Sequence, residues 1–522
     1  MSLVRFTACL FITATLFFIS HVNALGEPSS VVTEVKDYGY NFHEANNITP
    51  DIQTLTTDLF GDKIDPSSGS IAFEQTDISI PGNSSLPVAI TRTLSDPDSW
   101  FRETRDFENW SLAIPHVRST YITNSLGNSR NSYWATGDAC TKPLNSNPTF
   151  STTSEGNTYI ANKDAYWNGD TVSIPGHGSA KFTEKSGSNK RYNNRNWNVD
   201  CIVNPDGSDG FKITIDNGST YYFTKKRVVQ GIKPYNLVPA ISTAPCTNNC
   251  PMEAVGPTNS PDGAQYIQNF VFMLATRVED RFGNWVSYSY DAGGKLNKIS
   301  SNDSRIIDIY YTGNRVSSIT AQGKTWRYAY DDVYGVGLNT LNTVTRPDNK
   351  QWVFNHDKVS NNSLWNYHNI GEHAQAPHHG IQCIESGERD FIDITHPEGM
   401  VGEFVLDEVC QGMSDVPKIR RPNPNRRNYD TYWIPYASNL FAMSSKTLTF
   451  SNGESYIWNY LYSNNEGIFR GDAVEAKHRL PLNVSNVETA HLKSTTIINP
   501  DNSKIIQYFD RRYGRTAGNL TA

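Results

Sequence analysis

Aromatic and branched residues alternate with polar residues in short runs along most of the chain. The clearest run follows Gly283, where Val286, Tyr288 and Tyr290 occupy alternate positions before Asp291. Successive side chains of a strand point to opposite faces of a sheet, so this spacing predicts a strand with one apolar face. Short runs of this kind, separated by Gly, Pro, Asn and Asp, are typical of an all-β protein.

The same pattern returns through the second half of the chain. Seven copies align on a small turn residue, which is Gly283, Ser304, Gly323, Asn349, Gly399, Gly453 or Asn502. The aligned aromatic and acidic positions that follow are Tyr288, Tyr290, Asp291, Tyr328, Tyr330, Asp331, Phe354, Asp357, Phe404, Asp407, Trp458, Tyr460 and Asp510. Each copy therefore predicts a β-hairpin of roughly 20 residues, and a row of hairpins can bury the apolar face that a single one cannot.

The aspartate at the end of each strand is expected to start the next turn, because its carboxylate can accept a hydrogen bond from the backbone just ahead. A series of equivalent carboxylates is not the pattern of a catalytic acid and base, which need different environments. The later copies are less regular. Gly402 and Gln507 stand where other copies have bulky apolar residues, and Leu461 replaces the aspartate.

The first half of the chain predicts a different organisation. Residues 25–60 form a polar leader, and residues 61–265 form an irregular β-rich domain that ends in a Pro-, Asn- and Gly-rich linker at about 231–265. Within it, Phe211–Phe223 predicts a hairpin with Asn217-Gly218 in a type I′ turn. Residues 266–522 then form the repeat region, giving an all-β fold with a long curled sheet of hairpins.

Two stretches resemble bacterial Rhs/YD-repeat proteins. The segment Asp65–Arg92, with Ser68-Gly69 and Ile80-Pro81-Gly82, resembles the entry region of that family, and Thr276–Asp291 resembles a YD repeat almost residue for residue. The resemblance implies hairpins that wind into a hollow shell, which in complete members often encloses a C-terminal toxic domain. The core motif and toxin domain of complete members are not recognisable here, so the implied protein is a partial shell without its own toxin.

Residues 1–24 are typical of a secretory signal. Arg5 precedes the apolar stretch Phe6–Ile19, and Val22-Asn23-Ala24 fits a small-residue cleavage site. The alternative is an uncleaved N-terminal anchor. No other stretch approaches the length of a membrane span. We therefore expect a secreted or cell-surface protein, or a periplasmic one in a bacterium. The formal charge of −7 gives no electrostatic reason to expect nucleic acid as a partner.

Six cysteines remain after cleavage of the signal. An even number in an oxidising compartment favours disulfides over the alternative of buried free thiols. Sequence neighbourhood favours three pairings, Cys140–Cys201, Cys246–Cys250 and Cys383–Cys410.

Candidate chemistry is sparse in this sequence. His368, His373, His378 and His379 are weak metal-ligand candidates, since Pro377 places them in a loop and no His-Glu-x-x-His helix is present. A solvent-facing loop is the favoured interpretation, so no metal and no cofactor are expected. There is no Gly-x-Ser-x-Gly elbow and no phosphate-binding loop, which favours a protein that is not an enzyme.

Three functions are compatible with these features. The favoured hypothesis is an exported, non-enzymatic β-repeat scaffold whose partners are a toxin cargo or the remainder of a shell. The second is a cell-surface adhesin that binds glycans or proteins through its β-face, because aromatic residues on a strand can stack on sugars. The third is a secreted glycoside hydrolase, which would need two carboxylates across a cleft.

Overall fold

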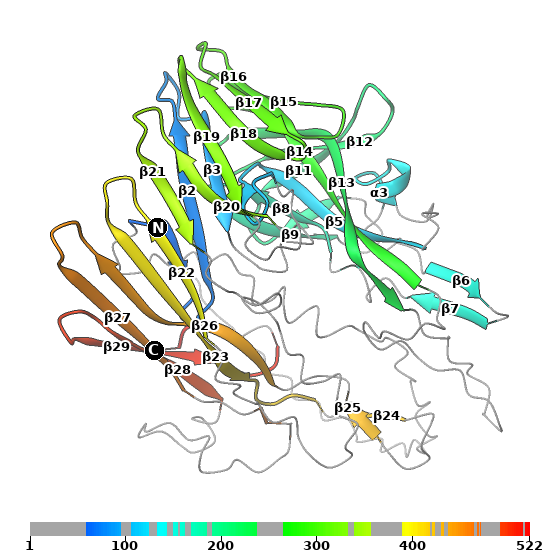
Figure 1. Ribbon diagram of the computed structural model, residues 1–522. Helices are drawn as coiled ribbons and strands as arrows, with labels where there is room; N and C mark the ends of the chain where they lie inside the picture. The colour runs from blue at the N-terminus through cyan, green and yellow to red at the C-terminus, as the bar shows by residue number, and fades with distance from the viewer. Residues whose placement is uncertain are drawn as a thin grey trace, which may run out of the picture. The chain divides into compact units, whose positions relative to one another are not determined.

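The computed structural model describes residues 59–94, 106–124, 133–142, 150–154, 157–161, 167, 169–184, 190–236, 265–331, 339–355, 389–417, 420–422, 430–432, 437–463, 467–468, 470, 491–514 and 517–521. Strands make up 62% of these residues and helix 1%, so the all-β class is confirmed. The short helix α3 spans Tyr133–Thr136. Residues 1–24, the predicted signal, and most of the predicted polar leader lie outside the described residues (Figure 1).

One antiparallel sheet contains 21 strands. Its members from the first half of the chain are β5 (His116–Asn124), β8 (Thr171–Ile174), β9 (Gly178–Glu184), β10 (Arg191–Asn193), β11 (Asn198–Val203), β12 (Asp209–Thr214) and β13 (Thr220–Asn236). Its members from the second half are β14 (Gln265–Glu279), β15 (Trp285–Tyr290), β16 (Leu296–Ser301), β17 (Ile306–Thr312), β18 (Arg315–Ala321), β19 (Lys324–Asp331), β20 (Thr340–Thr345), β21 (Gln351–Asn355), β22 (Arg389–Thr395), β23 (Val401–Gly412), β26 (Ala437–Thr449), β27 (Ser455–Tyr462), β28 (Leu492–Ile498) and β29 (Lys504–Asp510). Strands from both predicted regions therefore belong to a single sheet.

The long strand β14 is the branch point of this sheet. It pairs with β13 along one edge. On the other edge β5 pairs with its first part, Tyr266–Leu274, and β15 pairs with Arg277–Glu279. From β14 onward each strand of the sheet pairs with the next one, up to β28 with β29. The sheet is not closed, and the expected long row of hairpins is present.

The turn residues of all seven aligned copies have a left-handed backbone. Their φ angles are Gly283 85°, Ser304 67°, Gly323 72°, Asn349 64°, Gly399 87°, Gly453 87° and Asn502 64°. Six of the seven turns also share two backbone hydrogen bonds. In the first, Gly283 N donates to Asp280 O and Asp280 N donates to Asn284 O. This is the three-residue hairpin loop in which a type I turn precedes a left-handed residue.

The hairpin between β12 and β13 uses the same loop. Gly218 has a φ of 85°, whereas Asn217 is not among the residues with positive φ. A type I′ turn requires positive φ at both central residues, so the type I′ prediction for Asn217-Gly218 is wrong although the hairpin itself is present. The reason is loop length: Ile215 N donates to Ser219 O, which leaves three residues between the strands and needs only one left-handed residue.

A second, four-stranded sheet is built by the N-terminal strands. It runs in the order β1 (Asp62–Ile64), β2 (Ile71–Ser79), β3 (Ala89–Leu94) and β4 (Ser111–Leu112). Its apolar residues share one core with those of the large sheet, and the ring centroids of Phe73 and Phe404 are 4.9 Å apart. In Figure 1 the blue strands β2 and β3 lie beside the green and yellow repeat strands. Two small hairpins complete the described strands, β6 (Phe150–Ser154) with β7 (Asn157–Ala161) and β24 (Arg420–Pro422) with β25 (Asp430–Tyr432).

A disulfide joins Cys140 to Cys201 in β11. Cys410 in β23 is also disulfide-bonded, whereas Cys246, Cys250 and Cys383 lie outside the described residues. Within the part of the chain that the structure describes, no helix is long and apolar enough to cross a membrane.

Candidate functional site

An extensive polar site lies where residues 59–94, the entry segment, pack on the apolar face of the repeat sheet. This segment contains β1, β2 and β3, and it contacts hairpins that are far apart in the sequence. The Tyr328 hydroxyl of β19 donates to Asp77 Oδ2 at 2.9 Å. The Thr495 hydroxyl of β28 donates to the Pro66 carbonyl at 2.5 Å. One short segment therefore contacts β19 and β28, two strands that are far apart in the repeat region.

Phe60 anchors the start of the entry segment. Its side chain is fully buried, and its ring makes edge contacts with Trp352, His396 and Phe404 at centroid distances of 6.0 to 6.2 Å. A Cβ placed on Gly402 would lie 3.0 Å from two carbons of the Phe60 ring. The glycine that interrupts the apolar pattern of the fifth copy thus leaves the room that Phe60 fills.

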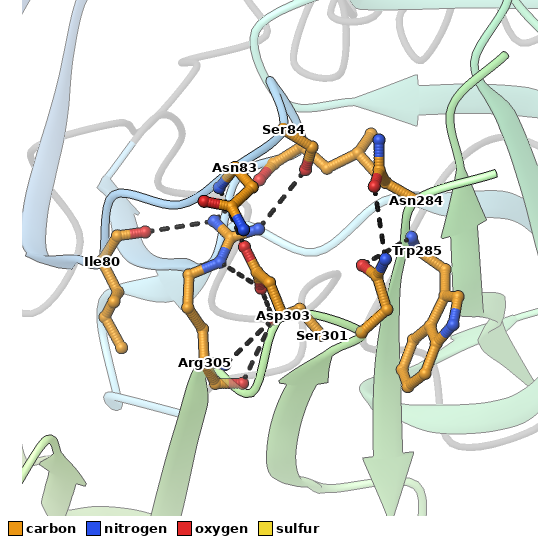
Figure 2. Close-up of polar contacts among 10 residues, drawn as sticks. Ile80, Asn83, Ser84, Asn284, Trp285, Ser301, Asp303 and Arg305 are labelled. Atoms are coloured by element: carbon orange, nitrogen blue, oxygen red, sulfur yellow. Dashed lines mark hydrogen bonds and ion pairs between the residues drawn. The ribbon is translucent and has the colours of Figure 1, made fainter. Parts of the chain in front are cut away.

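Arg305 clamps the turn between β2 and β3 to the repeat sheet (Figure 2). Its Nη1 donates to the carbonyls of Ile80 at 3.1 Å and Leu86 at 3.2 Å, and its Nη2 donates to Ser84 Oγ at 3.4 Å. Arg305 is only 6% exposed. The planar guanidinium can bond several acceptors at once in a way that a lysine cannot, so it fixes the position of the turn.

Asp303 completes the clamp from the same hairpin turn. Its Oδ1 accepts from Arg305 Nε at 2.7 Å, and its Oδ2 accepts from the backbone N–H of Asn83 at 3.0 Å. The hydrogen bond from Arg305, with further ones from Ser301 and Asn83, holds the pKa of Asp303 well below its usual range. Figure 2 shows these groups converging from the entry turn and from the turn that begins β17.

Arg92 and Asp77 form a buried bidentate pair between β3 and β2. The two bonds measure 2.6 Å from Nε to Oδ2 and 2.8 Å from Nη2 to Oδ1, and the two side chains are 0% and 1% exposed. The guanidinium carbon lies 4.8 Å from the Trp110 ring centroid and 5.1 Å from that of Phe354. Breaking such a pair by removing one partner leaves a buried charge, which costs about 3–5 kcal/mol.

Lys446 and Asp62 form a second buried pair, between β26 and β1. Lys446 Nζ lies 2.5 Å from Asp62 Oδ2, and neither side chain is exposed. Burial raises the pKa of Asp62, because desolvation penalises its charged form, although the nearby Lys446 acts in the opposite direction. Asp62 and Asp77 of the entry segment are therefore each paired with a cation and enclosed.

Tyrosines of the repeat bond to the paired strand on the other side of their own aligned turn. Their hydroxyls donate to main-chain carbonyls, from Tyr290 to Ala275 at 2.6 Å, from Tyr311 to Leu296 at 2.9 Å and from Tyr330 to Val316 at 2.7 Å. Burial raises the pKa of all three hydroxyls. In the copy that starts at Gly453 the same bond comes from Tyr462, to Met443 at 2.7 Å, rather than from the aligned Tyr460. The other aligned aromatics, Tyr288, Tyr328, Phe354, Phe404 and Trp458, pack in or against the core.

The aligned aspartates do not share one role. Asp291 starts a turn, since its Oδ1 accepts from the Lys295 N–H at 2.8 Å. Asp510 likewise accepts from a backbone N–H just ahead, that of Arg512. Asp407 instead lies inside β23 and pairs with Arg389 on β22 at 2.6 Å, because that strand continues past the aligned position. Asp331 is the last residue of β19, and Asp357 lies outside the described residues.

The weak metal candidates His368, His373, His378 and His379 also lie outside the described residues. Within the described ranges no group of three or more His, Cys, Asp or Glu side chains could hold a metal ion. A serine and a histidine do meet, with Ser414 Oγ 2.8 Å from His491 Nδ1. Such a pair can act as nucleophile and base, but Ser414 is fully buried and its hydroxyl is closed to a substrate.

The sequence interpretation missed Phe60, Arg305 and the pair of Asp62 with Lys446. Asp62 and Lys446 carried a faint signal, since each charged residue falls among apolar residues at an inward-facing strand position. Gly402 carried a stronger one, as a glycine at an apolar position of the repeat. Neither signal names the partner.

The comparisons with known proteins add little to this geometry. No protein-family model matches the chain, and no curated protein matches it. Among solved structures, the N-terminal domain of effector protein SpvB from Salmonella typhimurium strain LT2 is similar at 12% identity and a TM-score of 0.16, over 75% of this chain and 95% of that one. TcdB2-TccC3 without its hypervariable C-terminal region is similar at 9% identity and a TM-score of 0.17, over 86% of this chain and 21% of that one. TM-scores this low support no inference about the present chain.

Proposed function

We propose that this chain is an exported, non-enzymatic scaffold, a row of β-hairpins that forms part of a protein shell of the Rhs/YD type. The observation that carries the proposal is the repeated use of one turn in one sheet. The seven aligned turn residues all have left-handed backbones, and the hairpins that they close join a single antiparallel sheet. A sheet that grows by addition of equivalent hairpins is suited to build a wall.

The placement of buried charges is in keeping with a structural role. Asp62 and Asp77 are enclosed and paired with Lys446 and Arg92, so their charges serve packing. A glycoside hydrolase needs two carboxyl groups that both face a substrate and titrate differently. Export and the shell role come from the sequence, through the signal-like residues 1–24 and the resemblance to Rhs/YD proteins.

Co-expression tests the scaffold proposal. The full chain would be produced together with the polypeptide encoded directly downstream, and with an unrelated polypeptide of similar size as the control. We expect the downstream polypeptide alone to co-elute with the chain in size-exclusion chromatography and to be cleaved more slowly by an added protease. Equal cleavage of both polypeptides, or turnover of a glycoside by the purified chain, would contradict the proposal.

The adhesin remains a second candidate because one outward surface is apolar. Leu461, Ile506 and Ile457 are 56%, 49% and 47% exposed, and the register places Leu461 and Ile506 on either side of Thr496 across β27, β28 and β29. Exposed apolar patches often mark interaction sites. Specific binding on a glycan or protein array that is lost in Leu461→Lys would favour the adhesin over the scaffold.

A further inference from the structure

The buried pair of Asp62 and Lys446 has the geometry of two reactants. The two residues are 384 positions apart in sequence, on strands β1 and β26, yet Lys446 Nζ lies 2.5 Å from Asp62 Oδ2. Neither side chain has exposed surface. Reacting groups held in contact at a fixed orientation reach effective concentrations of about 10⁵–10⁸ M, so slow chemistry between them becomes feasible.

Aromatic rings enclose the pair. Lys446 Nζ lies 5.8 Å from the ring centroid of Phe404 and 5.5 Å from that of Trp458. The hydroxyl of the buried Tyr460 and the second carboxyl oxygen of Asp62 are both without a hydrogen-bond partner among the described residues. A carboxylate oxygen enclosed in this way lacks the donors that normally stabilise its charge.

These surroundings favour the neutral form of Asp62. Burial raises the pKa of this carboxyl group, and a fully buried ion pair carries a large desolvation cost. Transfer of one proton from Lys446 to Asp62 converts the pair into an amine and a carboxylic acid. A neutral amine is a nucleophile, and it then lies against an uncharged carboxyl group.

The geometry points to an intramolecular amide bond between Lys446 and Asp62, which covalently joins the entry segment to the repeat sheet. In this reaction Lys446 Nζ attacks Asp62 Cγ, the new Cγ–Nζ bond forms and one Cγ–O bond breaks. The oxygen leaves as water with two protons from the nitrogen. The ammonium and carboxylate charges cancel, and no oxidant or reductant is needed.

Tyr460 is close enough to Asp62 to sense its charge. Burial, together with the charge of Asp62, raises the pKa of its hydroxyl, so the hydroxyl keeps its proton near neutrality. The product removes both charges from the interior and leaves a neutral amide. It also closes a covalent loop from β1 to β26, which keeps the entry segment on the sheet even when the sheet is strained.

Mass spectrometry of the purified full chain tests this inference. After denaturation and reduction, we expect an intact mass lower by one water than the sequence predicts, and a proteolytic fragment in which the Asp62 and Lys446 peptides are linked. Lys446→Arg keeps the charge but should show the full mass. Asp62→Asn offers a sharper control, because it can form the same bond with loss of ammonia instead of water.

The outcomes are distinct even if a variant folds poorly. An unmodified mass for the folded wild-type chain would overturn the inference, and so would a lost water that maps to another peptide. The linked fragment should still appear in Tyr460→Phe, because the two reacting groups are unchanged in that variant, and its absence from a folded Tyr460→Phe protein would contradict a reaction that depends on the contact of Lys446 with Asp62 alone.

Discussion

The contact between Phe60 and Gly402 gives the sharpest test of how the entry segment is held. We expect Gly402→Ala to destabilise the protein. The new methyl carbon would lie 3.0 Å from two ring carbons of Phe60 and from one of Phe404, which is too close for carbon atoms in a packed core. Overpacking of this kind costs about 1–3 kcal/mol.

The sign of the change in the free energy of unfolding is informative for Gly402→Ala. Gly402 is not among the glycines with positive φ, so alanine meets no backbone strain there. At such a position Gly→Ala normally stabilises by about 0.4–1 kcal/mol, because it restricts the unfolded chain. A destabilised Gly402→Ala therefore reports the steric contact. Gly293→Ala is the matched control, since Gly293 also lacks positive φ and its Cβ would have its nearest neighbour at 3.4 Å.

Urea unfolding of four proteins completes the test. Phe60→Ala alone should lower the free energy of unfolding by about 3–5 kcal/mol, the usual cost of emptying a buried phenylalanine site. In the Phe60→Ala background, Gly402→Ala should cost less, because only the contact with Phe404 remains and space has opened beside it, so the two changes are coupled by about 1–3 kcal/mol. Equal effects of Gly402→Ala with and without Phe60 would refute the packing argument.

Three further changes probe other parts of the structure. Arg305→Lys should weaken the attachment of the Ile80–Leu86 turn by about 2 kcal/mol, because lysine lacks the several N–H donors of the planar guanidinium. We expect faster proteolysis within that turn, and unchanged cleavage would contradict the prediction. Replacing both Cys140 and Cys201 by alanine should lower the free energy of unfolding by about 4 kcal/mol, because the disulfide closes a loop with a sequence separation of 61 in the unfolded chain. An unchanged urea midpoint would contradict this prediction. Burial lowers the pKa of His116 from 6.5 to about 4. Its contribution to stability is therefore complete above pH 6.5 and is lost as pH falls towards 4. His116→Gln should flatten the dependence of the urea midpoint on pH in that range, and an equally steep profile would exclude His116 as the cause.

The repeat could be predicted from the sequence because its signals are local. The period-two stripe and the residues that tolerate a left-handed backbone, such as Gly283 and Asn349, both lie within a single hairpin. One departure from the pattern also has a structural reason, since Gly402 interrupts the apolar stripe at the point where the Phe60 ring of the entry segment occupies the space. The type I′ prediction at Asn217-Gly218 failed because dipeptide chemistry does not fix the number of residues in the loop.

The anchors of the entry segment could not be predicted in the same way. Arg305 and Ile80 are 225 positions apart, and Lys446 and Asp62 are 384 apart. No periodicity within either segment relates such partners, because the pairing depends on how the sheet passes over the segment. A charged residue at an inward-facing position indicates only that some partner exists.

These anchors also explain how the entry segment finds one position on a repetitive surface. A face made of similar hairpins offers similar apolar contacts after a shift by two residues along a strand or by one hairpin across the sheet. Apolar packing alone would therefore allow several registers. After any such shift Asp62 would be buried without Lys446, and an unpaired buried charge costs several kcal/mol. Asp77 would keep Arg92, which belongs to the same segment, but would lose the hydrogen bond from Tyr328. The buried polar contacts thus select one register by making the alternatives unfavourable, while the apolar face supplies most of the free energy of association.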